Sequence, residues 1–175
     1  VVGSLYPTVL RVERAVPLSA ASPSDPRDRA KYLRFTIHQR HLVQKSSVTY
    51  PIAINLHPSS LLWGVDDYEC PWLTGFMVQH STRLYAYDAS EATPHALLLF
   101  GERPRFDAER GQLVVGECAQ FKCKNGERII PLIDAARGAL QRLLQLKLEN
   151  PAVDYTGSRE LEAIVLLLGT GGLAF

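Results

Sequence analysis

The hydrophobic pattern of this chain changes its period near residue 130. Before that point, short apolar segments follow one another with the alternation of strands, and only one short helical segment interrupts them. After it, apolar side chains recur at the spacing of one helix face, at Ile133, Ala136, Leu140, Leu143 and Leu144. Strands that do not alternate with long helices argue against a doubly wound fold. The pattern therefore predicts a mainly β fold, a small barrel or sandwich, with C-terminal α-helices packed on it.

The predicted strands are short and are separated by turn signals. They cover residues 9–14, 31–38, 50–56, 72–80, 83–88, 105–107, 112–115 and 119–123, and the pair 72–80 and 83–88 forms either a hairpin or one long bent strand. A short helix is predicted at 95–100, because Thr93 and Pro94 form a helix start signal and Gly101 follows. Gly111 is predicted to close a hairpin between 105–107 and 112–115.

The helical tail is predicted to hold two helices. The helical period begins at Ile130, with Pro131 near the first turn, and Asn150 with Pro151 ends the first helix. Ser158 is the predicted N-cap of the second helix. We expect a single domain over residues 1–175, with strands at about 5–123, a helical tail at about 127–169 and a surface loop at 16–29.

Composition is that of a globular domain of ordinary size. The chain has 175 residues, of which 46% are hydrophobic and 21% are charged, so it can bury a core. Its formal net charge is +1, so any electrostatic footprint for nucleic acid has to be local. The longest apolar run near the C-terminus, 163–168, is far shorter than the roughly 20 residues of a membrane helix. No signal peptide is visible and no initiator Met is present, so we expect a fragment or processed form with no membrane partner.

Cysteine usage and motifs give no sign of a catalytic or metal site. Three cysteines do not form a disulfide framework, which favours an intracellular, reducing compartment, with nucleus, cytoplasm and mitochondrion not distinguished. Cys118 and Cys123 are spaced more widely than the usual zinc-binding pairs, so we interpret them as buried and unpaired. The chain has neither a Gly-x-Ser-x-Gly elbow nor a Gly-x-x-x-x-Gly-Lys-Ser/Thr loop. We expect no catalytic residue, metal or cofactor in this chain, and no enzymatic activity of the chain alone.

One predicted strand combines the groups that bind single-stranded nucleic acid. Cations and hydroxyls contact phosphates, and aromatic rings stack on bases. In this strand these groups are supplied by His80, Ser81, Thr82, Arg83, Tyr85 and Tyr87. In a strand, Arg83, Tyr85 and Tyr87 share one face. The alternative is an ordinary strand with one buried and one solvated face, and the residues alone favour that alternative.

Two further groups allow two interpretations each. His57, Ser59 and Ser60 could offer an imidazole and hydroxyls to a nucleic-acid backbone, or the serines could satisfy the amides of a turn. Lys122 and Lys124 form either part of a basic rim or an ordinary exposed strand face. The sequence leaves the alternatives open for the first group and slightly favours the ordinary face for the second.

An ordered set of segments resembles the C-terminal OB-fold module of DEAH/RHA-type (DExH-box) ATP-dependent RNA helicases. The similar segments span nearly the whole chain: Gly3-Ser4-Leu5-Tyr6-Pro7, His57-Pro58-Ser59-Ser60, Ser81-Thr82-Arg83 followed by Tyr85 and Asp88, Ala96–Gly101, and Asn150-Pro151 with the helix after it. The resemblance implies a five-stranded, partly open barrel of an RNA helicase whose ATPase lobes lie outside this chain.

The same resemblance implies a function and partners. The module would contact single-stranded RNA beside the helicase core and help to couple RNA binding to ATPase activity, with ATP and Mg²⁺ bound elsewhere in the parent protein. Its expected partners are single-stranded RNA, the helicase core of the same polypeptide and a protein activator or RNA-processing subunit.

The sequence departs from the family pattern at two positions that would contact RNA. Family members often carry Lys-Thr where this chain has His80-Ser81, and Arg where it has Tyr87. Because a neutral histidine is a poorer phosphate partner than lysine, we expect RNA binding at this strand either to be weaker or to shift toward tyrosine stacking and Arg83. The alternative function is a protein-docking module that recruits an activator or complex subunit to the helicase.

Overall fold

The computed structural model describes residues 2–6, 8–14, 30, 32–37, 51–116 and 119–169. The chain forms two compact units, Val1–Ala92 with Glu117–Ala119, and Thr93–Gly116 with Gln120–Phe175, and each is described by itself. The expectation of one domain over the whole chain stays a prediction. The loop predicted at 16–29 and Cys118 lie outside the described residues.

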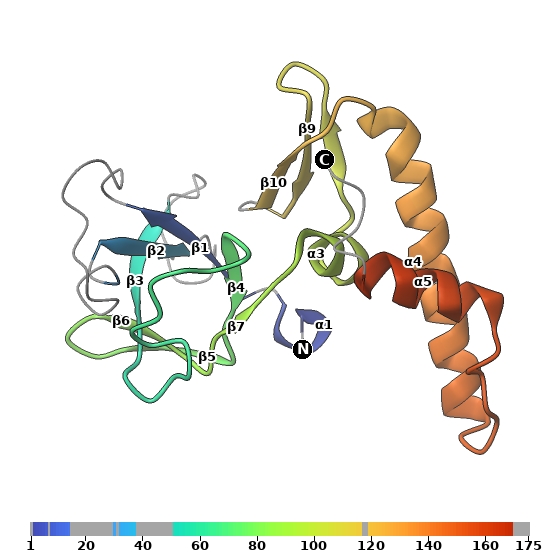
Figure 1. The fold of residues 1–175 in the computed structure, drawn as a ribbon, viewed down its shortest axis with the longest axis horizontal. Coiled ribbons are helices and arrows are strands. Elements are labelled where there is room, and N and C mark those ends of the chain that lie inside the picture. Colours follow the sequence, from blue (N-terminus) through green and yellow to red (C-terminus); the bar gives the residue numbers. More distant parts are fainter. Residues whose placement is uncertain are drawn as a thin grey trace. The chain divides into compact units, whose positions relative to one another are not determined.

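The first unit is a curled, half-barrel sheet of seven short strands, preceded by helix α1 (Val2–Leu5) (Figure 1). The strands are β1 (Val9–Arg14), β2 (Leu33–Ile37), β3 (Ile52–Leu56), β4 (Trp72–Thr74), β5 (Met77–His80), β6 (Leu84–Tyr87) and β7 (Ser90–Glu91). Their order across the sheet is β5-β6-β3-β2-β1-β4-β7. The paired strands run antiparallel, except that β3 and β6 run parallel.

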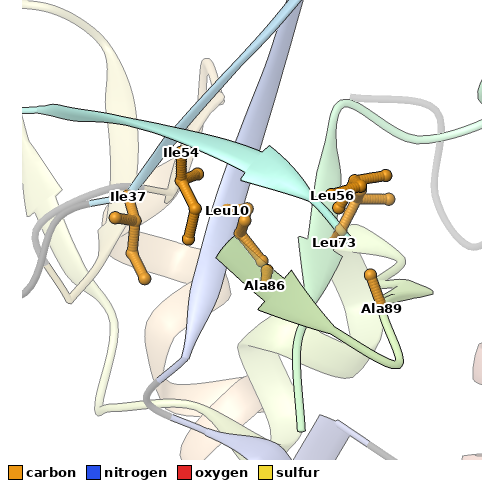
Figure 2. Close-up of a cluster of buried hydrophobic side chains, with 7 residues drawn as sticks. All are labelled: Leu10, Ile37, Ile54, Leu56, Leu73, Ala86 and Ala89. Carbon is orange, nitrogen blue, oxygen red and sulfur yellow. The ribbon is translucent and has the colours of Figure 1, made fainter. Parts of the chain in front are cut away.

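The core of the first unit lies against one face of this sheet. Register aligns Leu10 of β1 with Ile37 of β2 and with Leu73 of β4, and all three side chains are fully buried. Figure 2 shows how they gather with the inward-facing residues of β3 and β6, Ile54, Leu56 and Ala86. Because side chains alternate along a strand, the residues between these positions point to the opposite, outer face.

The predicted strand 72–80 is divided into β4 and β5. Gly75 is buried, and its N–H donates to the carbonyl of Thr8. The chain turns at this residue, and the strand after it no longer pairs with β1. β4 pairs with β1, whereas β5 pairs with β6 as the hairpin that the sequence predicts. The division follows from this pairing of distant strands, which the sequence does not show.

The second unit combines a small sheet with three helices. Its elements are α3 (Pro94–Phe100), β8 (Arg105–Asp107), β9 (Gln112–Val115), β10 (Ala119–Lys122), α4 (Gly126–Glu149) and α5 (Arg159–Gly169). The predicted start of α3 is confirmed, because the side chain of Thr93 accepts a hydrogen bond from the N–H of Ala96 and Pro94 occupies the first turn. The predicted β8–β9 hairpin is also confirmed, with Gly111 in the left-handed region at φ +60°.

Helix α4 begins at Gly126, earlier than Ile130, where the apolar period starts. Gly126 is buried, and the ring of Phe106 lies where a Cβ atom of this residue would be, so the position requires glycine. The first turn carries exposed polar residues such as Glu127, which is why the apolar period does not mark it. Pro131 therefore lies inside the helix, where it supplies no N–H.

The helices of the second unit pack on one another through a small apolar cluster. Leu99 of α3, Ala139 of α4 and Ile164 of α5 form its centre. As predicted, α4 ends before Asn150, and Ser158 precedes α5, with its Oγ 3.5 Å from the N–H of Leu161. Across the described ranges, no helix is long and apolar enough to span a bilayer. The mainly β class with C-terminal helices that the sequence predicts is confirmed, and the curled half-barrel agrees with an OB-fold-like architecture, but its sheet has seven short strands where the resemblance implies five.

Candidate nucleic-acid interface

The outer face of the half-barrel carries the tyrosines that the sequence singles out. Tyr85 and Tyr87 are alternate residues of β6 and flank Ala86, which is fully buried in the core. Since successive side chains of a strand point to opposite faces, both tyrosines point away from the core. Both are partly exposed. The predicted shared face of these two residues therefore exists, and it is the outer one.

His57 completes a group of three rings with these tyrosines. It follows β3, and its N–H donates to the carbonyl of Ala86 at 2.9 Å, which fixes it beside β6. Its imidazole stacks on Tyr87, with ring centroids 4.1 Å apart and an interplanar angle of 23°. It meets Tyr85 edge-on, at 5.8 Å and 82°. We call His57, Tyr85 and Tyr87 the ring cluster.

The two serines after His57 have different surroundings. The Oγ of Ser59 lies 2.7 Å from Nδ1 of His57, and the N–H of Ser59 donates to the same nitrogen at 3.2 Å. Ser59 is exposed. Ser60 is buried, and its Oγ accepts the N–H of Ala89 at 3.2 Å. Of the two hydroxyls, only that of Ser59 lies at the ring cluster and within reach of solvent.

The predicted polar residues lie at the end of β5 and in the turn before β6. His80 ends β5, and Ser81, Thr82 and Arg83 form the turn. All four are exposed, and the N–H of Ser81 donates to the carbonyl of Arg83 at 2.9 Å. Among the described residues, no carboxylate lies within ion-pair distance of Arg83. The turn therefore supplies an uncompensated positive charge next to the strand that holds the two tyrosines.

Sequence reasoning missed the outer-face neighbours of the tyrosines. Register places Asn55 beside Tyr85 on one side and Gln79 beside it on the other. Asn55 donates from Nδ2 to the carbonyl of Leu84 at 3.4 Å, and Gln79 is exposed. The alternation of 52–56 signals that Asn55 points away from Ile54, but the position of Gln79 follows only from strand register, which the sequence does not show.

Lys122 and Lys124 lie in the second unit. Lys122 is exposed at the end of β10, next to buried Phe121, and Lys124 is exposed in the turn that follows. This alternation agrees with an ordinary exposed strand face and with a basic rim alike. Their role stays a prediction.

A small pocket in the first unit holds two titratable groups whose pKa values are shifted. It has a volume of about 170 Å³ and is lined by residues that include Val12, Leu33, Tyr68 and Cys70. Burial, followed by the nearby carboxylate of Glu91, raises the pKa of Tyr68 to about 12. Burial, followed by the carboxylates of Glu91 and Glu69, also raises the pKa of the Cys70 thiol, which disfavours the thiolate.

Within the described segments, no group of three or more His, Cys, Asp or Glu side chains is arranged to hold a metal ion. Cys70 and Cys123 are free and buried. The unpaired state predicted for Cys123 agrees with this, while Cys118 lies outside the described residues. The ring cluster with Arg83 is thus the arrangement in the first unit that best suits a ligand.

Known proteins similar to this chain are helicases. No family model matches the sequence. The ATP-dependent DNA/RNA helicase DHX36 of Mus musculus is 28% identical over 114 residues, which cover 65% of this chain and 11% of that protein. DHX36 of Homo sapiens is 27% identical over 114 residues, with the same shares of the two chains. The DExH-box ATP-dependent RNA helicase DExH1 of Arabidopsis thaliana is 30% identical over 119 residues, which cover 66% of this chain and 12% of that protein.

The similarity covers most of this chain but only 11–12% of the length of the relatives it matches. It agrees with the resemblance seen in the residues themselves, since both point to the same class of helicase. The chain is therefore similar in sequence to a segment of DExH-box helicases, over about two thirds of its own length.

Proposed function

We propose that this chain is a non-catalytic accessory domain of an ATP-dependent DExH-box RNA helicase and that its first unit binds single-stranded RNA. The observation that carries the RNA-binding proposal is the ring cluster on the outer face of the half-barrel. In this proposal the ATPase lobes, with ATP and Mg²⁺, belong to the same polypeptide outside this chain. RNA held on the half-barrel beside those lobes would help to couple RNA binding to ATP hydrolysis.

The ring cluster suits bases because of where its rings lie. Aromatic faces stack on any base, so such a surface binds single strands with little sequence preference. His57 already covers one face of Tyr87, and its edge contact with Tyr85 holds the three rings as one surface. The buried Ala86 and Leu56 behind these residues anchor the surface to the core. A base would therefore meet rings that are already ordered, which lowers the entropy cost of binding.

Some of the described cations of the first unit are paired with carboxylates, and others are free for phosphate contact. Arg11 pairs with Glu13 at 3.0 Å, and Arg14 pairs with Asp67 at 2.7 Å, so these cations are partly neutralised. Arg83 has no such partner among the described residues. Arg34 is exposed and likewise has no ion-pair partner among the described residues, so the salt dependence of binding would report how many of these cations contact phosphates.

Removing a ring from the cluster is expected to weaken RNA binding strongly. Tyr85→Ala and Tyr87→Ala should each lower the affinity for a fluorescein-labelled oligouridylate by about 1–3 kcal/mol, which is about five- to a hundredfold. Fluorescence anisotropy at low salt measures the dissociation constants. Tyr155→Ala, which removes a tyrosine from the α4–α5 connection of the second unit, is the control and should leave affinity unchanged. Circular dichroism checks that each variant is folded. The proposal fails if the wild-type chain does not bind, or if all three variants bind alike.

The contribution of phosphate contact can be read from the salt dependence. Arg83→Gln should reduce the slope of log affinity against log salt by about 0.7, the value for one phosphate of a single strand. Arg110→Gln is the matched control, because Arg110 is equally exposed but lies in the β8–β9 turn 3.8 Å from Asp107. An unchanged slope for Arg83→Gln, or an equal change in both variants, would show that Arg83 does not contact the RNA.

A second candidate function is protein docking. It is favoured by exposed apolar side chains in the first unit, since Leu61, Trp63 and Phe76 are 95%, 58% and 68% exposed. Exposed aromatic and large aliphatic residues are characteristic anchors of protein interfaces. A pulldown with this chain distinguishes the two functions: a protein partner retained after nuclease treatment favours docking, and one that is lost favours an RNA bridge.

A further inference from the structure

Nδ1 of His57 receives two contacts from one residue. The N–H of Ser59 donates to it at 3.2 Å, and the Oγ of Ser59 lies 2.7 Å from it. A backbone N–H is always a donor, so the nitrogen that it meets must offer a lone pair. Nδ1 is therefore an acceptor, and the Ser59 hydroxyl donates to it as well. The ring proton of the neutral imidazole then resides on Nε2.

Nε2 of His57 remains available to a ligand. Nε2 makes no hydrogen bond to any of the described residues. It is also absent from their buried side-chain atoms that lack a partner, so Nε2 is accessible to solvent. The ring that carries it is stacked on Tyr87 and in edge contact with Tyr85. One donor N–H is thus presented at the ring cluster, in an orientation set by contacts on the other side of the ring.

We propose that Ser59 is a positioning residue, which holds the His57 ring against Tyr87 and keeps its Nε2–H directed outward as a donor to an oxygen acceptor of the bound strand. The acceptor is a phosphate, sugar hydroxyl or base carbonyl oxygen. This inference rests on the proposed function, because the strand is the RNA of that proposal. It gives Ser59 a different role from Ser60, whose hydroxyl accepts the N–H of Ala89 inside the fold.

The orientation has a physical consequence that can be measured. Without the Ser59 hydroxyl, the imidazole keeps only the longer contact to the backbone N–H, and rotation about its χ2 angle becomes easier. The stacking on Tyr87 would then be populated for less of the time. A single neutral hydrogen bond contributes about 0.5–1.5 kcal/mol, so the affinity for RNA should fall about two- to tenfold.

The test compares Ser59→Ala with Ser59→Thr, which restores a hydroxyl. The first readout needs no RNA: the carbon-bound ring protons of His57 should show a ring-current shift from Tyr87, and nuclear Overhauser contacts with it, in nuclear magnetic resonance spectra. We expect both signals to weaken in Ser59→Ala and to persist in Ser59→Thr. The second readout is the affinity for the labelled oligouridylate, which should fall two- to tenfold in Ser59→Ala and recover in Ser59→Thr.

Each outcome decides one part of the inference. Ring signals that do not change in Ser59→Ala would overturn the positioning role. Changed ring signals with unchanged affinity would show that Nε2–H does not contact the strand. Failure of the proposed function has a separate signature, since the wild-type chain would then not bind the oligouridylate although the ring signals respond to Ser59. His57→Gln supplies the assignment of the ring signals in the spectra.

Discussion

Leu10→Ala is expected to lower the free energy of unfolding of the first unit by about 2–5 kcal/mol. Leu10 is fully buried, and its strand lies between β2 and β4, so the lost methyl groups would leave a cavity at the centre of the core. Both tryptophans of the chain, Trp63 and Trp72, lie in the first unit, so their fluorescence reports its unfolding. A urea titration followed by this fluorescence measures the change.

The matched control is Leu61→Ala, because the Leu61 side chain is 95% exposed and belongs to the same unit. Its expected effect is within about 0.5 kcal/mol, as for most surface substitutions. If both variants change the free energy of unfolding equally, then Leu10 does not lie in the hydrophobic core of the first unit. The comparison also bears on the candidate interface, since the rings of Tyr85 and Tyr87 stand on the opposite face of the sheet that Leu10 supports.

Strand and helix segments could be read from the sequence because their signals are local. The cap at Thr93, the glycine turn at Gly111 and the β-branched content of 9–14 are signals carried by residues close together in the chain. The helical tail expected from about 127 starts close to Gly126, where α4 begins, although the apolar period starts only at Ile130. The need for glycine at position 126 depends on the ring of Phe106, a contact that the sequence does not show. The division of 72–80 at Gly75 likewise depends on contact with β1.

The ring cluster was predictable in its members but not in its geometry. Tyr85 and Tyr87 share a face by simple alternation, which the sequence shows. The stack of His57 on Tyr87 requires the parallel pairing of β3 with β6, and parallel partners far apart in sequence leave no local signal. The same pairing brings Asn55 beside Tyr85. The sequence therefore names the candidate side chains, and the structure shows which of them lie together.

Arg137→Ala is expected to lower the free energy of unfolding of the second unit by about 2–4 kcal/mol, because a charged donor that serves several carbonyls is lost. From α4, Arg137 donates to the carbonyl of Leu98 at 2.8 Å and to that of Gly101 at 2.7 Å, with a longer contact to Glu102 at 3.4 Å. The last carbonyls of a helix have no partner within it, so the guanidinium closes the C-terminal end of α3 and also complements its dipole.

Because the second unit has no tryptophan and holds α3, α4 and α5, the helical circular dichroism signal follows its unfolding. Arg142→Ala on the same helix is the control, since Arg142 makes only an exposed contact with Glu160 at 4.0 Å, and pairs of this kind contribute at most about 1 kcal/mol. Arg137→Lys should fall between the two, because a single ammonium group cannot reproduce the geometry of the guanidinium fork. If Arg137→Ala costs no more than Arg142→Ala, then packing through Leu99, Ala139 and Ile164 holds the three helices together without this bridge.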